Sequence, residues 1–184
     1  MYYTSIPADL LKRNPQMQEK IEIKKQRKIQ LRDIILGGQD GLVNILGLSL
    51  GLFAAHSSGR IIIIAALAAG FSEAVSMGAV AYTSASADET RQKAGLLFDS
   101  VVVGITALIG AILPIIPFFF LSGNSVAAVI IAIIISACVL FGFGISKAKV
   151  VGGNPWRSGL QILLIGLVSA FAGFLIGWLL GVVN

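Results

Sequence analysis

The chain has 184 residues, of which 56% are hydrophobic and 12% are charged, and its formal net charge is +5. Ordinary soluble domains hold roughly 45–50% apolar and about 25% charged residues, so this composition excludes a water-soluble globular protein. The basic excess does not indicate nucleic-acid binding, because the basic residues flank apolar segments and no aromatic-basic surface accompanies them. The single cysteine, Cys138, excludes an internal disulfide and a thiolate metal cluster within one chain.

Five apolar segments are long enough to cross a bilayer, which takes roughly 20 helical residues. They are predicted at residues 34–55, 61–84, 97–121, 125–145 and 160–182. Pro114 and Pro117 predict a kink near the far end of the third segment. The sequence therefore predicts an all-α integral membrane protein, with a basic N-terminal segment at 1–32 and a five-helix transmembrane domain at 33–184.

The N-terminal segment carries eight of the fourteen Lys and Arg residues, all within residues 9–32. Its apolar periodicity is poor, which leaves open a helix lying on an anionic membrane surface or a solvated lead-in to the first span. Cytoplasmic loops concentrate Lys and Arg. A cytoplasmic N-terminus places thirteen of the fourteen on that side and only Arg60 on the other, so we expect this orientation, with the termini on opposite sides.

The fifth segment carries glycines at every fourth position, namely Gly173, Gly177 and Gly181. Small residues at this spacing allow helices to approach closely in lipid. Packing against another helix of the chain is the default interpretation, and a subunit interface is the alternative.

Two carboxylates, Asp40 and Glu73, are the only acidic residues well inside the predicted spans. A charge at mid-bilayer costs about 2.5–3.5 kcal/mol on insertion scales. Asp40 lies roughly 9 Å from the inner end of its helix and Glu73 roughly 18 Å from the outer end of its own, so both reach similar depths in a core of about 30 Å. Asn44 stands one turn from Asp40, and Met77 one turn from Glu73.

These four residues form a candidate metal site of mixed chemistry. Carboxylates attract divalent cations, and a thioether favours transition metals over Mg²⁺ or Ca²⁺, which indicates iron or manganese. A carboxylate must lose its proton to bind metal, so competition between metal and proton is a sufficient mechanism for antiport. The alternative is that Asp40 and Glu73 are neutral or hydrogen-bonded and hold helices together.

Other polar residues support weaker hypotheses. Asp33 and Asp99 lie near the inner ends of their helices, where they form either a solvated mouth or a cation-gathering entrance. His56 lies in an outer loop and is expected to be solvated. The sequence has no phosphate-binding loop, paired-histidine motif or nucleophile elbow. It therefore predicts a protein that is not an enzyme and has no permanently bound cofactor, with any transport secondary or passive.

Two segments carry a family resemblance. Residues 37–44 (GGQDGLVN) and 72–82 (SEAVSMGAVAY) resemble the Asp-Gly-Leu and Ser-Met-Gly signatures of the vacuolar iron transporter family. Members of that family move Fe²⁺, and often Mn²⁺, out of the cytosol in exchange for protons. The resemblance implies that Asp40 and Met77 line a transport pathway between the protomers of a homodimer. Such a dimer would supply four carboxylates and two thioethers.

The chain departs from the family pattern in two places. The second-span glutamate of the family typically precedes the methionine by eight residues, where this chain has Ala69, and we expect Glu73 to substitute for it one turn closer to the cytoplasm. Plant members insert a Glu- and Met-rich metal-binding region between the second and third spans. Here about a dozen polar residues intervene, including Asp88 and Glu89, so cytoplasmic buffering should be reduced or absent.

The sequence thus predicts a proton-coupled antiporter that exports Fe²⁺ or Mn²⁺ from the cytosol. Its expected partners are the metal ions and protons it moves, membrane lipid and a second copy of the chain. Its expected location is a cell membrane or a vacuole-type membrane. The alternatives are a passive divalent cation channel and a non-transporting membrane scaffold held together by its glycine faces.

Overall fold

The computed structural model describes residues 15–87, 95–121, 123 and 125–183. All regular structure in these residues is helical, and five helices are long and apolar enough to cross a membrane. The predicted all-α, five-span architecture is confirmed. The predicted polar loop with Asp88 and Glu89 lies outside the described residues. The elements are α2 (Pro15–Ala54), α3 (Gly59–Ala87), α4 (Leu96–Ile112), the 3-10 helix η1 (Leu113–Ile115), α5 (Ile116–Phe120), α6 (Ser125–Val151) and α7 (Pro155–Val183).

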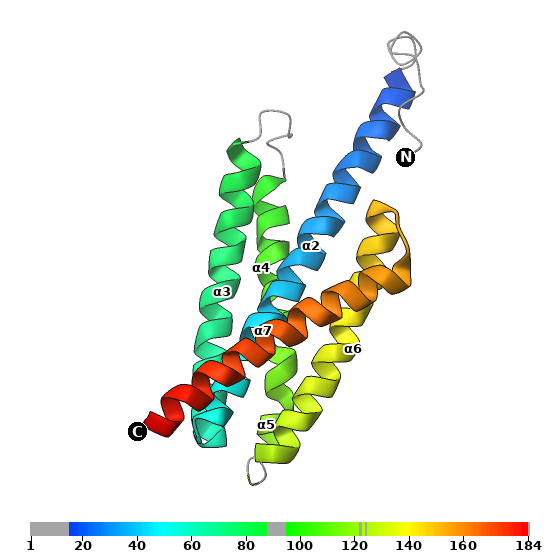
Figure 1. Cartoon of the computed structure of the whole chain (residues 1–184). Coiled ribbons are helices and arrows are strands. Elements are labelled where there is room, and N and C mark those ends of the chain that lie inside the picture. The colour runs from blue at the N-terminus through cyan, green and yellow to red at the C-terminus, as the bar shows by residue number, and fades with distance from the viewer. Residues whose placement is uncertain (1–14, 88–94, 122, 124, 184) are drawn as a thin grey trace.

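The first helix, α2, is much longer than a membrane span requires. Only its part from Gln30 to Ala54 has the composition of a span, and the preceding residues from Pro15 prolong the same helix past the other helices (Figure 1). At about 1.5 Å per residue, this extension is roughly 22 Å long. Residues 15–32 therefore continue the first span, rather than forming a separate helix turned along the membrane surface. Residues 1–14 lie outside the described part.

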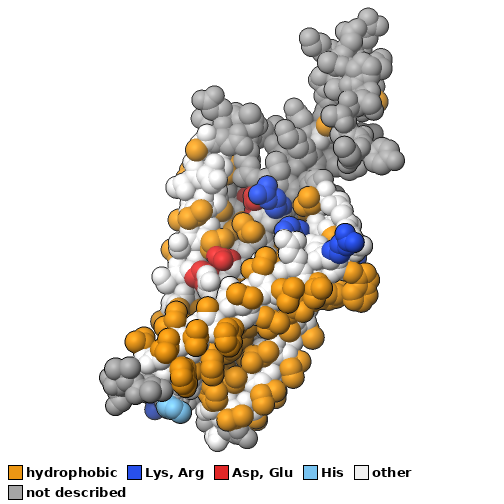
Figure 2. Space-filling model, in the orientation of Figure 1, with side chains coloured by type: hydrophobic (Ala, Val, Ile, Leu, Met, Phe, Trp, Pro, Cys, Tyr) orange, Lys and Arg blue, Asp and Glu red, His pale blue; other side chains and the backbone are white. Residues whose placement is uncertain are grey.

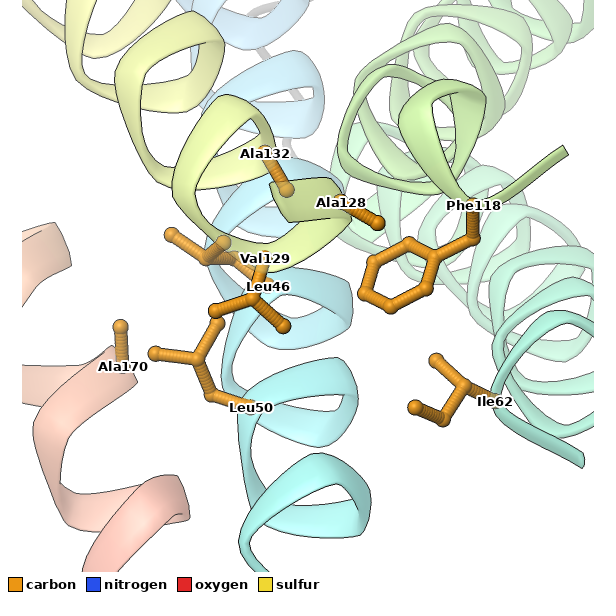
Figure 3. Close-up of a cluster of buried hydrophobic side chains, with 8 residues drawn as sticks. All are labelled: Leu46, Leu50, Ile62, Phe118, Ala128, Val129, Ala132 and Ala170. Atoms are coloured by element: carbon orange, nitrogen blue, oxygen red, sulfur yellow. The ribbon is translucent and has the colours of Figure 1, made fainter. Parts of the chain in front are cut away.

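The centre of the bundle is the spanning part of α2, which packs against α3, α4, α6 and α7. Its large buried residues belong to three hydrophobic clusters. Leu46 and Leu50 pack with residues from α3, α5, α6 and α7, including Phe118 (Figure 3). Ile45 packs with residues of α3, α4 and η1, and Leu42 with residues of α6 and α7. These contacts fix one face of α2 in the core and leave the opposite face of the helix available for polar residues.

Glycines allow α7 to cross α2 with the two backbones in contact. A Cβ atom added to Gly51 would lie 2.8 Å from the carbonyl oxygen of Gly173, and one added to Gly177 would collide with the backbone of Gly51. A Cβ on Gly181 would lie 2.8 Å from the Cα of Ala55. The glycines of the fifth segment therefore pack against another helix of the same chain, which was the default interpretation of their spacing.

The third span is broken at its two prolines. Proline lacks a backbone N–H and its ring clashes with the preceding turn, so α4 ends at Ile112 and the chain continues through η1 into the short α5. The α-helix is thus interrupted where the prolines predicted a kink. Pro114 and Pro117 are both buried, which places the break inside the bundle.

The last two helices are longer than the sequence predicted, because the helix of α6 runs to Val151 and that of α7 starts at Pro155. Asn154 caps α7, since its Oδ1 accepts hydrogen bonds from the backbone N–H groups of Trp156 at 3.0 Å and Arg157 at 3.3 Å. A side-chain oxygen at this position satisfies donors that the first turn leaves unpaired. The helices therefore extend beyond the spans predicted at 125–145 and 160–182, because polar residues at the end of a span can continue its helix.

Candidate metal site

The face of α2 opposite its core contacts carries Asp40 and Asn44. The two residues are one turn apart on the same side of the helix, and both are exposed in the single chain. Leu42 and Leu46, which point into the bundle, are fully buried. The fold therefore holds these two polar side chains on the outside of the bundle, in the middle of a span, because the apolar residues between them commit the other face to the core.

The neighbouring helix, α3, brings Glu73 to the same place, and Met77 lies one turn further along this helix. Both are half-buried. The amide nitrogen of Asn44 donates a hydrogen bond of 2.7 Å to Oε1 of Glu73, and the carboxyl of Asp40 lies close enough to interact with that of Glu73. The structure thus brings together the carboxylates that the sequence placed at similar depths.

The four candidate residues are arranged in two levels. Helices α2 and α3 are joined by a short turn and run antiparallel (Figure 1). Since Asn44 faces Glu73, the residue four places earlier on α2 faces the residue four places later on α3, which pairs the level of Asp40 with that of Met77. One level holds an amide and a carboxylate, and the other holds a carboxylate and a thioether. The backbones of the two levels are about 6 Å apart along the helices, and the carboxyl of Asp40 reaches toward that of Glu73.

Exposed hydrophobic residues lie on the same two helices. Figure 2 shows acidic side chains on the face turned to the viewer, above a broad band of hydrophobic side chains. Leu36, Val75 and Val80 are among the exposed hydrophobic residues on α2 and α3. Within the described residues, no three His, Cys, Asp or Glu side chains come close enough to hold a metal ion together. A single chain therefore offers two carboxylates, an amide oxygen and a thioether, which is an incomplete set for a divalent cation that takes six oxygen ligands.

The hydrogen bond defines what Asn44 can do. Its Nδ2 faces Glu73, so its Oδ1, the only atom of the amide that can bind a cation, is left for another partner. The bond also agrees with part of the alternative interpretation, in which the carboxylates are hydrogen-bonded and hold helices together, because it links α2 to α3. Asn44 is thus able both to position Glu73 and to supply an oxygen ligand.

Ala69, where the family pattern has its glutamate, is in a different environment. It packs against the buried cluster that contains Ile45, Ala66 and Ala111. A carboxylate there would meet apolar side chains, whereas Glu73, one turn further along α3, meets the amide of Asn44. If Glu73 substitutes for that glutamate, as the sequence predicts, the carboxylate lies beside a hydrogen-bond donor.

The other polar residues lie away from this site. Asp99, in the first turn of α4, accepts a hydrogen bond of 2.9 Å from Nε2 of Gln30. This bond links α4 to α2 where the spans begin, and the sequence pattern gave no indication of it because Gln30 lies among charged residues. Asp33 is half-buried on α2. His56 lies in the turn between α2 and α3 with φ of 59°, far from Asp40 along the helix.

Comparisons with known proteins identify the family of the chain. The family model described as the VIT family matches residues 31–97 and 89–178, which include α2 from Leu31 onward, all of α3 and most of α7. The chain is similar to vacuolar iron transporter 1 of Arabidopsis thaliana, with 22% identity over 209 aligned positions that cover 78% of this chain and 83% of the relative. It is 23% identical to vacuolar iron transporter 1 of Eucalyptus grandis and 24% identical to the vacuolar iron transporter of Centaurea cyanus, each over 78% of this chain. The chain belongs to the VIT family.

Proposed function

We propose that this protein is a secondary transporter that moves Fe²⁺ or Mn²⁺ across a membrane in exchange for protons. The observation that carries the proposal is the hydrogen bond between Asn44 and Glu73, which joins two spans beside Asp40 at the middle of their membrane-crossing parts. Ionisable residues in spans mark ion pathways more often than they serve structure. The relatives named as iron transporters support the same class of substrate.

The exchange follows from the chemistry of the ligands. A carboxylate binds metal only in its deprotonated form, so a metal ion entering from the cytosol displaces protons from Asp40 and Glu73, and protons entering from the other side displace the metal. The thioether of Met77 favours a transition metal over Mg²⁺. Two levels of ligands about 6 Å apart allow the ion to pass from one to the next without being held too tightly to leave.

The proposal includes a homodimer that covers the exposed face of α2 and α3. A single chain would expose Asp40 to lipid in the middle of a span, at a cost of about 2.5–3.5 kcal/mol if the residue is charged. A second copy related by a two-fold axis would place the same residues opposite one another. The pair would then supply four carboxylates, two amide oxygens and two thioethers to one pathway.

The proposed orientation places the N-terminus and the basic α6–α7 connection in the cytoplasm, following the concentration of Lys and Arg on that side. Metal would then be exported from the cytosol, across a cell membrane or into a vacuole-type compartment. On this proposal the protein catalyses no covalent chemistry and needs no resident cofactor, since the proton gradient drives the movement.

The test is metal uptake into proteoliposomes that contain the purified protein and have an acidic lumen, with Mn²⁺ or reduced Fe²⁺ outside. Uphill uptake should require the pH gradient and should fall at least tenfold with Asp40→Asn or Glu73→Gln. The matched control is Asp99→Asn, which also removes one carboxylate but lies at the Gln30 contact outside the site. It should retain uptake; a raised KM in this variant would instead assign Asp99 to a cation-gathering entrance.

Three results would contradict the proposal. Uptake that follows only the metal gradient would indicate a passive cation channel. Uptake unchanged by Asp40→Asn and by Glu73→Gln would show that the pathway lies elsewhere. No uptake of any divalent cation by demonstrably folded protein would favour a membrane scaffold.

A further inference from the structure

The connection between α6 and α7 lies at the edge of the membrane-crossing region. It consists of residues 152–154 only, and the helices on both sides are membrane spans, Ser125–Val151 and Pro155–Gly181. Three residues do not allow the chain to move away from the bilayer between the spans. The last turns of α6 and the first turn of α7, together with this connection, are here named the α6–α7 hairpin (residues 147–157), and they lie where lipid headgroups meet the acyl chains.

Three basic side chains flank this connection. Lys147, Lys149 and Arg157 are all exposed, and none forms an ion pair with a carboxylate among the residues that the structure describes. Figure 2 shows Lys and Arg side chains along the border of the hydrophobic band, at the end opposite His56. Basic side chains at headgroup depth attract anionic lipid, and a guanidinium binds phosphate oxygens with two parallel N–H donors.

An aromatic pair lies beside these charges. Trp156 is 74% exposed, and its ring packs at a tilt against that of Phe141, with centroids 5.4 Å apart. The contact orients the indole at the membrane boundary, where tryptophan prefers to lie. The backbone N–H groups of Trp156 and Arg157 are already bound by Asn154. A ligand at this place therefore meets side chains rather than the free end of the helix.

We propose that the α6–α7 hairpin binds the headgroup phosphate of an anionic phospholipid, with Lys149 and Arg157 as its charged partners and Trp156 against the upper part of the lipid. The depth of the charges favours a lipid over a soluble phosphate, because both basic residues lie in the terminal turns of spans. This surface is separate from the site on α2 and α3, so the proposal does not depend on the transported ion.

The two tryptophans of the chain allow a local test. In a Trp178→Phe variant, all tryptophan fluorescence comes from Trp156, and lipids brominated near the top of their acyl chains quench it on contact. The full chain is placed in vesicles of phosphatidylglycerol and phosphatidylcholine at 20:80, with either lipid brominated in turn. We expect brominated phosphatidylglycerol to quench Trp156 several-fold more than its share of the vesicle lipid would give by random contact. Each neutralised charge should reduce this preference about fivefold, so Lys149→Gln with Arg157→Gln should abolish it.

Matched controls locate the effect. Arg60→Gln, which removes the exposed basic residue at the other end of the spans, should leave the preference at Trp156 unchanged, and Arg157→Lys should retain most of it. The reverse reporter, Trp178 in a Trp156→Phe chain, should show little preference. Quenching in proportion to lipid content in the parent, or a preference that survives the double substitution, would overturn the proposal.

Discussion

Removing the side-chain amide of Asn44 isolates what its hydrogen bond contributes. The bond to Oε1 of Glu73 is 2.7 Å long, and hydrogen bonds to charged groups contribute about 1.5–3 kcal/mol. Because Asn44 is exposed in the single chain and Glu73 only half-buried, we take the lower end, about 1.5 kcal/mol. A chain of this size loses about 2–4 °C per kcal/mol, so Asn44→Ala should lower the Tm of the metal-free protein by about 3–6 °C.

Replacing the same amide by a carboxylate should also lower the stability of the metal-free protein, but it should increase the stabilisation by bound metal. Asn44→Asp places a third carboxylate beside Asp40 and Glu73, and two like charges at about 4 Å repel by up to about 4 kcal/mol at an effective dielectric of 20. The metal-free Asn44→Asp protein should therefore be less stable than Asn44→Ala. A divalent cation neutralises the added charge, and binding at one hundred times Kd stabilises a protein by about 2.7 kcal/mol. The rise in Tm with Mn²⁺ should be largest in this variant.

The assay is thermal unfolding of the detergent-solubilised protein, with and without Mn²⁺, for the parent and both variants. The expected order without metal is parent, then Asn44→Ala, then Asn44→Asp. The expected order of the metal-induced rise is Asn44→Asp first and Asn44→Ala last. The reasoning fails if Asn44→Asp is as stable as the parent without metal, or if Mn²⁺ raises the Tm of all three proteins equally.

Three further predictions use other contacts. Gly51→Ala puts a Cβ atom 2.8 Å from the Gly173 carbonyl oxygen and should destabilise the protein by about 1–3 kcal/mol. Gly142→Ala, whose Cβ would have nothing within 4 Å, should not destabilise it. Equal denaturation midpoints for the two variants would contradict the close α2–α7 crossing. Met77→Leu conserves volume and should change stability by less than about 1.5 kcal/mol, while proteoliposome competition should show reduced selectivity for Mn²⁺ over Mg²⁺. Lowering the pH should weaken Mn²⁺ binding in calorimetry, because protons compete for the carboxylates; Asp40→Asn should flatten this dependence, and an unchanged slope would exclude Asp40 from the site.

The number and approximate positions of the spans could be predicted because lipid accepts only segments whose backbone is bonded internally and whose side chains are largely apolar. The ends of the helices could not. Lys147 and Lys149 read as the end of a span in the sequence, yet α6 continues through them to Val151. Hydropathy reports where the bilayer ends, whereas the helix ends where its hydrogen bonds are capped, as at Asn154.

The candidate site could be predicted in part, because Asp40 and Glu73 are costly in a span and therefore conspicuous in the sequence. Their proximity followed from counting residues along antiparallel helices. The contact between Gln30 and Asp99 could not be found in this way, since polar residues near a helix end are common and nothing in the pattern pairs one with another.

The sequence by itself determined the class of protein, the five spans, and the two carboxylates that need an explanation, because the hydrophobic effect and the cost of burying charge act on composition and spacing alone. Only the tertiary structure decided which atoms meet. It directs the nitrogen of Asn44 rather than its oxygen toward Glu73, places the family's glutamate position, Ala69, in an apolar cluster, and leaves Asp40 exposed. These outcomes depend on how α3 and α7 rotate and cross against α2. Close backbone contacts at glycines such as Gly51 set the crossing of α7, and the spacing of residues in the sequence does not give these rotations.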